Sequence, residues 1–377
     1  MDGTTSPDQQ PTSNPSAGPS ANIVLKAAGF NPLSQLLPNT TSDLHTFHPI
    51  LPESHSTRLL FTGWSCTAFL ADNTLHIQGP EPLTQSLDLD VATTLHSAFG
   101  DHDRFLGCLS TTNGALYLLD PTVNRFERQG DDDSPRLGFV ALAGNGALAA
   151  TIKQLPSSNL MHLLYFPTLP DFLAWFTDPP SVQLDSSTQH FPLPGRPSQL
   201  VAGAGTFTLL MESGEVYTWG DPRYRSLGRD IATSPAEQPG PVEALGGLKV
   251  VKVAAGGWVS GAVSEDRAGY VWGTGTLGEE RTMAPLKEAG GEVGLVEIES
   301  AGEVADVVDL AVGEGFMAAV VEGGTVFVVG GNRCGQLGLG EGAPEFVEEW
   351  TEISDMHDVQ SVVCGPKASL IYQNPPP

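Results

Sequence analysis

The sequence predicts an all-β protein, a seven-bladed β-propeller closed by pairing of its N- and C-terminal strands. Three observations predict this fold. A hairpin-like unit recurs along the chain, glycine and proline are abundant at 43 and 30 of 377 residues, and apolar residues reach 40% while charged residues stay at 16%. That apolar content is enough for a core, and the glycines and prolines suit short strands joined by tight turns.

The repeat is clearest in three segments, which are VAGAGTFTLLMESGEVYTWG (201–220), AAGGWVSGAVSEDRAGYVWG (254–273) and AVGEGFMAAVVEGGTVFVVG (311–330). In each segment a first glycine, Gly203, Gly256 or Gly313, precedes a second glycine by 17 residues. An apolar run follows the first glycine, a second glycine-bearing turn comes next, and a β-branched or aromatic run completes the unit. This order is typical of a β-hairpin.

Weaker copies extend the repeat to both ends of the chain, at residues 61–79, 105–120, 139–152 and 361–372. The marker glycines of the seven units are Gly63, Gly107, Gly144, Gly203, Gly256, Gly313 and Gly365. They lie between 37 and 59 residues apart, which is the length of a propeller blade. The last copy lacks its second half, and IVLKAAGFNPLSQLL (23–37) resembles that half. Strands from the two ends therefore share one blade, so that no sheet edge stays open.

The chain divides into one large unit and two short tails. Residues 1–21 are rich in Pro, Ser, Thr and Gln and are expected to form a disordered tail, because they contain too little apolar surface to offset their ordering entropy. The single propeller is expected over 22–372, with a short tail at 373–377. Two insertions interrupt the repeat, the apolar segment 155–197 and the acidic segment 275–306.

Charge and cysteine content exclude several classes of protein. A net charge of −26 argues against direct binding of nucleic acid, because phosphates are neutralised by clustered Lys and Arg. No apolar run is long enough to span a bilayer, so no membrane is expected as a partner. Four cysteines without a C-x-x-C pair suggest neither a zinc site nor a disulfide framework. We expect an intracellular protein of the nucleus, the cytoplasm or both, present as a monomer.

The second half of the clearest units resembles a known repeat. TVFVVG followed by GGNRCGQLGLG (330–340) is similar to the second half of the regulator of chromosome condensation repeat, W-G-x-N-x-x-G-Q-L-G, and KVAAGGWVSGAV resembles its first half. The resemblance runs from about residue 22 to residue 372 and is strongest over 197–340. Within this family the small single-propeller members called domain-containing proteins are most similar, and fungal α-tubulin suppressor proteins come second.

The sequence departs from the family pattern at two kinds of position. The histidine that the family places three residues after a marker glycine is replaced by Cys66, Thr206, Val259, Phe316 and Ala368. Apolar contacts are expected to take over its role in packing the inner strands. The second half-motif is also broken, as DPRYRSLG (221–228) and TGTLG (274–278).

The resemblance implies a non-catalytic interaction scaffold, regulatory and associated with chromatin or chromosome segregation through a protein partner such as a jumonji-type oxygenase. An alternative that it implies is guanine-nucleotide exchange on a Ran-like small GTPase, although the basic tail of a chromatin-bound exchange factor is absent. A further alternative is a tubulin-suppressor-like role in diphthamide and transfer-RNA modification. No catalytic residue, cofactor or metal site is predicted.

Three patterns that superficially suggest chemistry have simpler explanations. Gly273, Gly275 and Gly278 spell G-x-G-x-x-G, but acidic residues and a proline follow instead of a phosphate-binding helix, so the repeat explains the glycines better. His45 and His48, near Asp43, are interpreted as loop histidines rather than metal ligands. The acidic runs 101–103 and 131–133 are interpreted as solvated turns.

Aromatic residues supply the candidate partner-binding positions. Trp64, Trp258 and Phe316 follow marker glycines, where a ring either packs between blades or contacts a partner, and packing is the favoured interpretation. In the insertion 155–197 the candidates are Phe172, Trp175 and Phe176. This apolar segment either covers one face of the propeller or presents an apolar patch to a partner.

Overall fold

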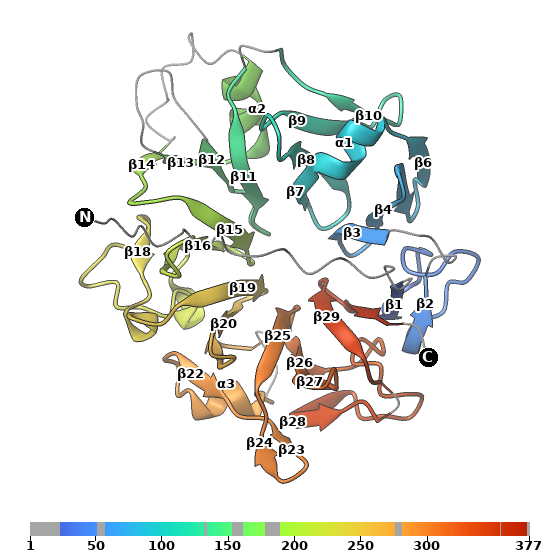
Figure 1. Cartoon of the computed structure of the whole chain (residues 1–377), viewed down its shortest axis with the longest axis vertical. Coiled ribbons are helices and arrows are strands. Elements are labelled where there is room, and N and C mark those ends of the chain that lie inside the picture. Colours follow the sequence, from blue (N-terminus) through green and yellow to red (C-terminus); the bar gives the residue numbers. More distant parts are fainter. Residues whose placement is uncertain are drawn as a thin grey trace, which may run out of the picture.

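The predicted propeller is confirmed by a computed structural model (Figure 1). The structure describes residues 23–50, 57–131, 134–152, 161–177, 189–275, 281–354 and 356–374. Within these ranges the strands form seven four-stranded antiparallel sheets, the blades, arranged around one axis, and a separate two-stranded ribbon. The tail 1–21 lies outside the described residues.

The first three blades contain the weaker copies of the repeat. Blade 1 consists of β3 (Thr57–Thr62), β4 (Thr67–Ala71), β5 (Thr74–Gln78) and β6 (Leu83–Ser86). Helix α1 (Leu89–Thr94) leads to blade 2, which consists of β7 (Leu95–Gly100), β8 (Phe105–Ser110), β9 (Leu116–Asp120) and β10 (Arg125–Arg128). Blade 3 consists of β11 (Leu137–Leu142), β12 (Leu148–Ile152), β13 (His162–Phe166) and β14 (Gln189–Pro192), with helix α2 (Leu169–Thr177) between its last two strands.

The next three blades contain the strong copies. Blade 4 consists of β15 (Pro197–Ala202), β16 (Thr206–Met211), β17 (Val216–Gly220) and β18 (Gly240–Pro241). Blade 5 consists of β19 (Val250–Gly256), β20 (Val259–Ser264), β21 (Gly269–Gly273) and β22 (Gly294–Val296), with helix α3 (Ala284–Glu288) before β22. The ribbon of β23 (Glu299–Ser300) and β24 (Glu303–Val304) precedes blade 6, which consists of β25 (Val307–Val312), β26 (Phe316–Val321), β27 (Val326–Gly331) and β28 (Phe346–Glu352).

Blade 7 closes the ring as the sequence predicts. Its strands are β29 (Val359–Cys364) and β30 (Ala368–Gln373) from the C-terminal end and β1 (Val24–Gly29) and β2 (Leu44–Pro49) from the N-terminal end, in the order β2-β1-β30-β29. Val24 pairs with Gln373 and Gly29 pairs with Ala368, so β1 and β30 match along their full length. Strand β30 therefore extends one residue past the boundary expected at 372.

Polar side chains join the innermost strands of neighbouring blades, which have no backbone ladder between them. Ser97 of β7 bonds the backbone of Val140 in β11, and Gln199 of β15 bonds the backbone of Val253 in β19. Lys252 of β19 forms an ion pair with the buried Asp309 of β25. These bridges hold the blades in register around the axis.

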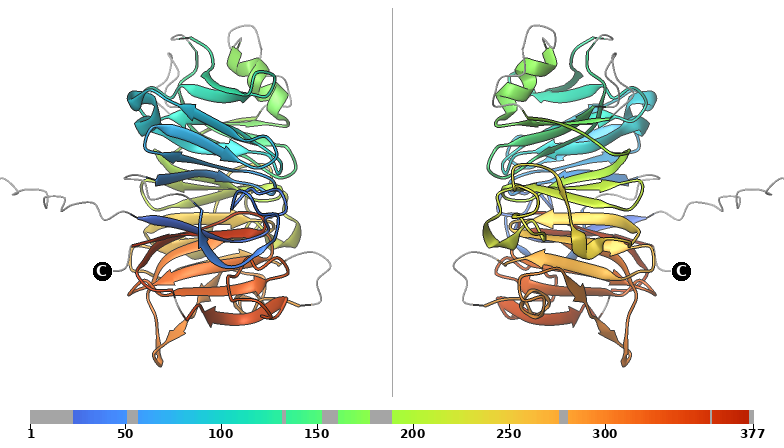
Figure 2. Two further views of the ribbon diagram at one scale, coloured as in Figure 1. Left: turned by 90° about the vertical axis from the view of Figure 1, so that its right-hand side faces the viewer. Right: turned by 90° about the vertical axis from the view of Figure 1, so that its left-hand side faces the viewer.

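The two faces of the propeller carry different connections (Figure 2). Each blade is antiparallel, so the loops from first to second strand and from third to fourth strand emerge on one face, which we call the loop-side face. The turns from second to third strand and the links between blades lie on the opposite face. The described part of the acidic insertion 275–306 contributes α3, β22 and the β23–β24 ribbon.

Helix α2, within the described part of the apolar insertion 155–197, packs onto blades 2 and 3. The rings of Phe172, Trp175 and Phe176 in α2 are 0%, 6% and 1% exposed and pack with Leu109 of blade 2 and Phe166 of blade 3. Of the two expectations for this segment, the structure shows the covering role for α2. No helix in the described part of the chain is long and apolar enough to cross a membrane.

Candidate functional site

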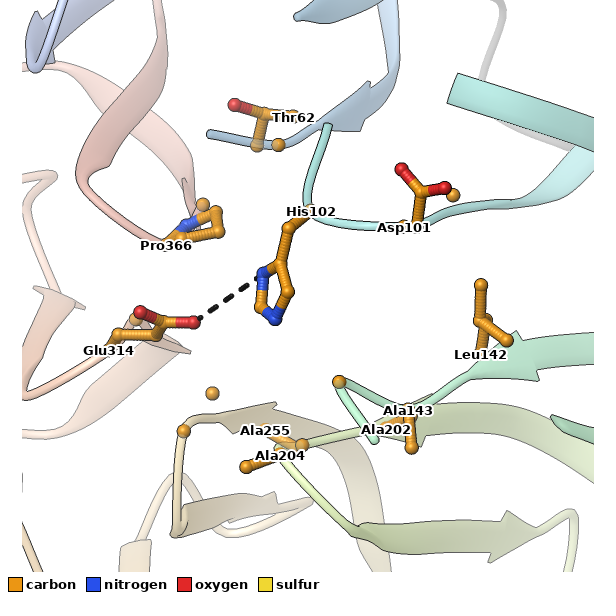
Figure 3. A pocket seen from close by; sticks show the side chains of 18 of the residues that line it. Thr62, Asp101, His102, Leu142, Ala143, Ala202, Ala204, Ala255, Glu314 and Pro366 are labelled. Atoms are coloured by element: carbon orange, nitrogen blue, oxygen red, sulfur yellow. Dashed lines mark ion pairs between the residues drawn. The ribbon is translucent and has the colours of Figure 1, made fainter. Parts of the chain in front are cut away.

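The marker glycines meet at the propeller axis on the loop-side face. They surround a cavity of about 230 Å³ that we call the axial mouth (Figure 3). A lining glycine comes from each blade, namely Gly63, Gly100, Gly144, Gly203, Gly256, Gly313 and Gly365. The marker predicted for blade 2 is therefore wrong, because Gly107 lies within β8 and Gly100 ends β7 at the mouth.

Close approach between blades explains these glycines. A Cβ on Gly256 would lie 2.4 Å from the carbonyl oxygen of Val312, and one on Gly203 would lie 2.7 Å from that of Gly257. The freed space lets loops of adjacent blades bond each other, since the amide of Ala204 donates to the carbonyl of Gly257 at 2.7 Å. The mouth is consequently framed by rigid backbone.

A histidine and a glutamate face each other across the axial mouth (Figure 3). Nδ1 of His102, from the loop of blade 2, lies 3.8 Å from Oε1 of Glu314, from the loop of blade 6. Their side chains are 51% and 28% exposed. Asp101 also borders the mouth, and its Oδ1 accepts bonds from the amides of Asp103 and Arg104. The run 101–103 is thus an ordered turn beside the mouth, and the pair His102–Glu314 had no sequence signal because the two residues lie in different repeats.

Trp258 is the centre of an aromatic and cationic cluster on the same face. Its ring lies 4.9 Å from that of Tyr224, and the guanidinium carbon of Arg223 lies 5.4 Å from the Trp258 ring centroid. Asp221 holds this guanidinium through Nε at 2.8 Å and Nη2 at 2.5 Å. The ion pair lowers the pKa of Asp221 through its hydrogen bonds with Arg223. Trp258 is half-buried.

Trp64 forms a second cluster of the same kind beside the mouth. Nζ of Lys367 lies 5.7 Å from the Trp64 ring centroid, and the ring of Phe30 meets it edge-on at 5.9 Å. Nζ of Lys367 also donates to the carbonyl of Glu314 at 3.3 Å. Trp64, like Trp258, is half-buried. A cation placed over an aromatic face is attracted to it electrostatically.

The third marker-linked ring is part of the core. Phe316 is 0% exposed and packs with Ala28, Ala318 and Val320. Phe316 and the three α2 rings are therefore not accessible in the folded chain, and they are not part of the surface formed by the two tryptophans. The structure agrees with the favoured interpretation of Phe316 as a core residue.

The positions where the family histidine is absent are packed as expected. All five residues, Cys66, Thr206, Val259, Phe316 and Ala368, are buried. Burial raises the pKa of the Cys66 thiol to about 11, so this cysteine is held as a neutral, weakly reactive group. The four cysteines are free, as the sequence suggests.

The half-motif in the third-to-fourth-strand loop has a clear structural role. Oδ1 of Asn332 accepts the amide of Leu337 at 3.1 Å, and in blade 7 Oδ1 of Asn31 accepts the amide of Leu36 at 2.9 Å. The motif glycine, Gly335, has φ +76°. In the broken copy of blade 4 the same motif position is Arg225, which keeps the left-handed backbone at φ +56°. This costs about 1 kcal/mol in a residue with a side chain.

The remaining chemical patterns do not assemble a site among the described residues. No group of three His, Cys, Asp or Glu residues there is arranged to hold a metal ion. His45 and His48 lie in β2 rather than in the expected loop, and Nε2 of His48 bonds Thr46 at 3.1 Å. Gly273 ends β21, and Gly278, Asp132 and Asp133 lie outside the described residues.

The fold and the mouth together define a class of protein, the seven-bladed propellers whose glycine-framed loops surround an axial mouth. A sequence model of the regulator of chromosome condensation (RCC1) repeat matches residues 213–263. The chain therefore contains an RCC1 repeat over these residues.

Relatives match about half of the chain. RCC1 domain-containing protein 1 of Mus musculus is 31% identical over 212 residues, which cover 47% of this chain and 55% of the relative. The Homo sapiens protein of the same name is 30% identical over 214 residues, which cover 47% and 56%. The chain therefore spans about half the length of the curated relatives that it matches.

Solved structures share the fold along nearly the whole chain. Prp20p from Saccharomyces cerevisiae superposes with a TM-score of 0.63 at 13% identity, covering 95% of this chain and 93% of that one. Human WBSCR16 superposes with a TM-score of 0.59 at 16% identity, covering 93% and 99%. At these identities the likeness shows the fold alone.

Proposed function

We propose that this protein is a non-catalytic scaffold that binds a protein partner through the loop-side face around the axial mouth. The observation that carries the proposal is the pair of half-buried tryptophans on this face, Trp64 and Trp258, each lying under a cation. Trp, Tyr and Arg are the residues that most often dominate binding energy at protein interfaces.

The Trp258 cluster is organised before any partner arrives. Asp221 fixes the guanidinium of Arg223 with two oxygens, and the ring centroids of Tyr224 and Trp258 lie 5.9 and 5.4 Å from the guanidinium carbon. Arginine loses much side-chain entropy when a partner immobilises it, so a side chain that is already held loses less on binding. The cluster therefore supports specific contact rather than a purely solvated surface.

The nature of the partner is proposed from the family resemblance. The domain-containing relatives imply a chromatin-associated or chromosome-segregation partner, such as a jumonji-type oxygenase, and a nuclear or cytoplasmic location. Prp20p, which shares the fold, has binding properties toward Gsp1p and histones. Exchange on a Ran-like GTPase is accordingly the second candidate function, and the tubulin-suppressor role is the third.

A charge-reversal pair tests the scaffold function. Arg223→Glu disrupts the loop-side cluster, whereas Arg267→Glu changes an exposed arginine on the opposite face that also pairs with a carboxylate, Glu322. Affinity capture of the tagged full chain, quantified by mass spectrometry, is expected to lose its specific partners with Arg223→Glu and to keep them with Arg267→Glu. Equal capture by both variants would contradict a role for this face.

The exchange alternative has its own assay. The full chain at micromolar concentration is mixed with a Ran-like GTPase loaded with fluorescent GDP, and nucleotide release is followed over time. The scaffold proposal expects the spontaneous release rate. An acceleration of tenfold or more, lost in Arg223→Glu, would make exchange the function.

A further inference from the structure

Most blades place an apolar residue of one loop over the next blade. In blade 4 the loop after β17 reaches blade 5, where Nε1 of Trp272 donates to the carbonyl of Ser226 at 3.1 Å. In blade 5, Met283 and Leu286 pack against Met317 of blade 6.

The same arrangement continues around the ring. The loop after β27 reaches blade 7, where Oγ of Ser369 donates to the carbonyl of Gln336 at 2.6 Å and Leu337 packs against Phe47. The loop after β1 reaches blade 1, where Nε2 of Gln35 donates to the carbonyl of Trp64 at 2.9 Å. The motif leucines of these loops, Leu36, Leu227 and Leu337, are no more than 2% exposed.

Blade 1 has no such loop, and the link between the third and fourth strands of blade 2, residues 121–124, is equally short. Its third and fourth strands, β5 and β6, are joined by residues 79–82 alone, which are too few to reach across blade 2. A groove of about 430 Å³ lies at this junction on the loop-side face. Its apolar lining comes from the blade 7 loop, blade 1 and blade 2, namely Leu33, Ile77, Pro80, Phe105, Leu106 and Leu119.

We propose that this groove receives a leucine-bearing turn of the protein partner, which takes the place that the chain's own loops occupy at the junctions after blades 4, 5, 6 and 7. The inference rests on the proposed function and names the contact chemistry on the same face. Leu33 at the groove is 42% exposed, an unusual exposure for a large apolar residue that borders a cavity.

Two further observations specify the occupant. Residues 1–22 of this chain contain no large apolar side chain except Met1, so that tail does not supply the leucine. The rim of the groove carries Glu81 and Asp103, and its one arginine, Arg104, already lies 3.5 Å from Asp101. A basic residue beside the leucine therefore complements the rim.

The chain's own blade 6 loop provides a probe. A fluorescent peptide copying residues 331–340, GNRCGQLGLG, with Cys334→Ser, contains both the motif leucine and Arg333. Its binding to the full-length protein is measured by fluorescence anisotropy, beside a control peptide with Leu337→Asp. We expect the first peptide to bind and the control peptide to bind at least tenfold more weakly.

Protein variants locate the binding site. Leu33→Glu is expected to raise the Kd at least tenfold, and Glu81→Arg about threefold. The matched control Leu295→Glu, at a leucine of β22 outside the groove that is 48% exposed against 42% for Leu33, is expected to leave the Kd unchanged. Thermal unfolding of each variant checks that the fold is kept.

The outcomes separate this inference from the proposed function. No binding of the peptide to the wild-type protein, or binding that Leu33→Glu leaves unchanged, overturns the groove proposal. If capture of partners still depends on Arg223 in that case, the scaffold function stands without the groove. If the peptide binds in the groove but no partner depends on Arg223, the groove stands and the proposed contact at the Trp258 cluster fails.

Discussion

Nδ1 of His102 lies 3.8 Å from Oε1 of Glu314, so residues of blades 2 and 6 meet across the propeller axis. The loops that carry them are fixed by inter-blade backbone bonds, including those from Trp64 to His102 at 2.8 Å and from Glu314 to Pro366 at 3.3 Å. The pair therefore spans the axial mouth on a rigid frame, and its side chains are the movable part.

Glu314→Gln is expected to change the free energy of unfolding by less than about 0.5 kcal/mol, because the contact with His102 is long, at 3.8 Å, and open to solvent. Urea denaturation at neutral pH checks this. A loss above about 2 kcal/mol would show that the pair holds the blades together and does not merely border the mouth.

The buried bridge between blades 5 and 6 is expected to behave differently. Asp309→Ala removes the partner of Lys252 and the acceptor for the amide of Val362, which donates to Oδ2 at 3.0 Å. A loss of about 2–3 kcal/mol is expected, since Lys252 is partly exposed and regains some hydration. The control Glu322→Gln, at an exposed pair with Arg267, should cost less than about 0.5 kcal/mol. Equal losses in the two variants would contradict a special role for the buried bridge.

Gly220, which ends the third strand of blade 4, has a backbone conformation that favours glycine. Gly220 has φ +116°, and a Cβ there would lie 2.4 Å from the carbonyl oxygen of Gly205. Gly220→Ala is expected to lower the free energy of unfolding by about 2 kcal/mol or more, measured by chemical denaturation. Gly195→Ala is the matched control, since a Cβ there meets only the methyl carbon of Met211 at 3.6 Å. A small effect at both positions would contradict this reason for the glycine.

Stability is expected to fall as the pH drops below about 6.5. Nε2 of His190 lies 2.6 Å from Nδ1 of His162, and burial together with His162 lowers the pKa of His190 from its usual value of 6.5. The unfolded chain then binds a proton at a pH where the folded chain does not, which favours unfolding. His190→Asn should reduce the loss of unfolding free energy between pH 7 and pH 5, measured by urea titration. The part of that loss due to His76, whose pKa is also lowered by burial, should remain. An unchanged pH dependence would contradict the assignment to His190.

The fold was predictable from the sequence because each repeat needs small residues at the same positions, so the pattern recurs along the chain. Gly203, Gly256 and Gly313 appear at equal positions in similar surroundings, so the close approach they allow is visible without a structure. In blade 2 the segment around Gly107 resembles a marker segment, although Gly107 lies within β8. This glycine is needed for another reason, since a Cβ there would lie 2.2 Å from the carbonyl oxygen of Tyr117. A single weak copy does not distinguish the two causes.

The site was less predictable, because it depends on contacts between repeats. The sequence indicates Trp64 and Trp258 by their distance from marker glycines, but not the cations above them, which come from another loop or another blade. Phe316 lies three residues after its marker glycine, at the start of β26, and its ring is buried in the packing between blades. Which way a ring points at such a position is decided by neighbours distant in sequence.

The most direct test of partner binding at the loop-side face is hydrogen–deuterium exchange of the captured complex, compared with the free protein. We expect slower exchange in the complex at residues 221–228 and 254–259, around the Trp258 cluster, and no change in the opposite-face turns 265–268 and 322–325. Protection confined to those opposite turns, with the loop-side segments unchanged, would contradict binding at the loop-side face.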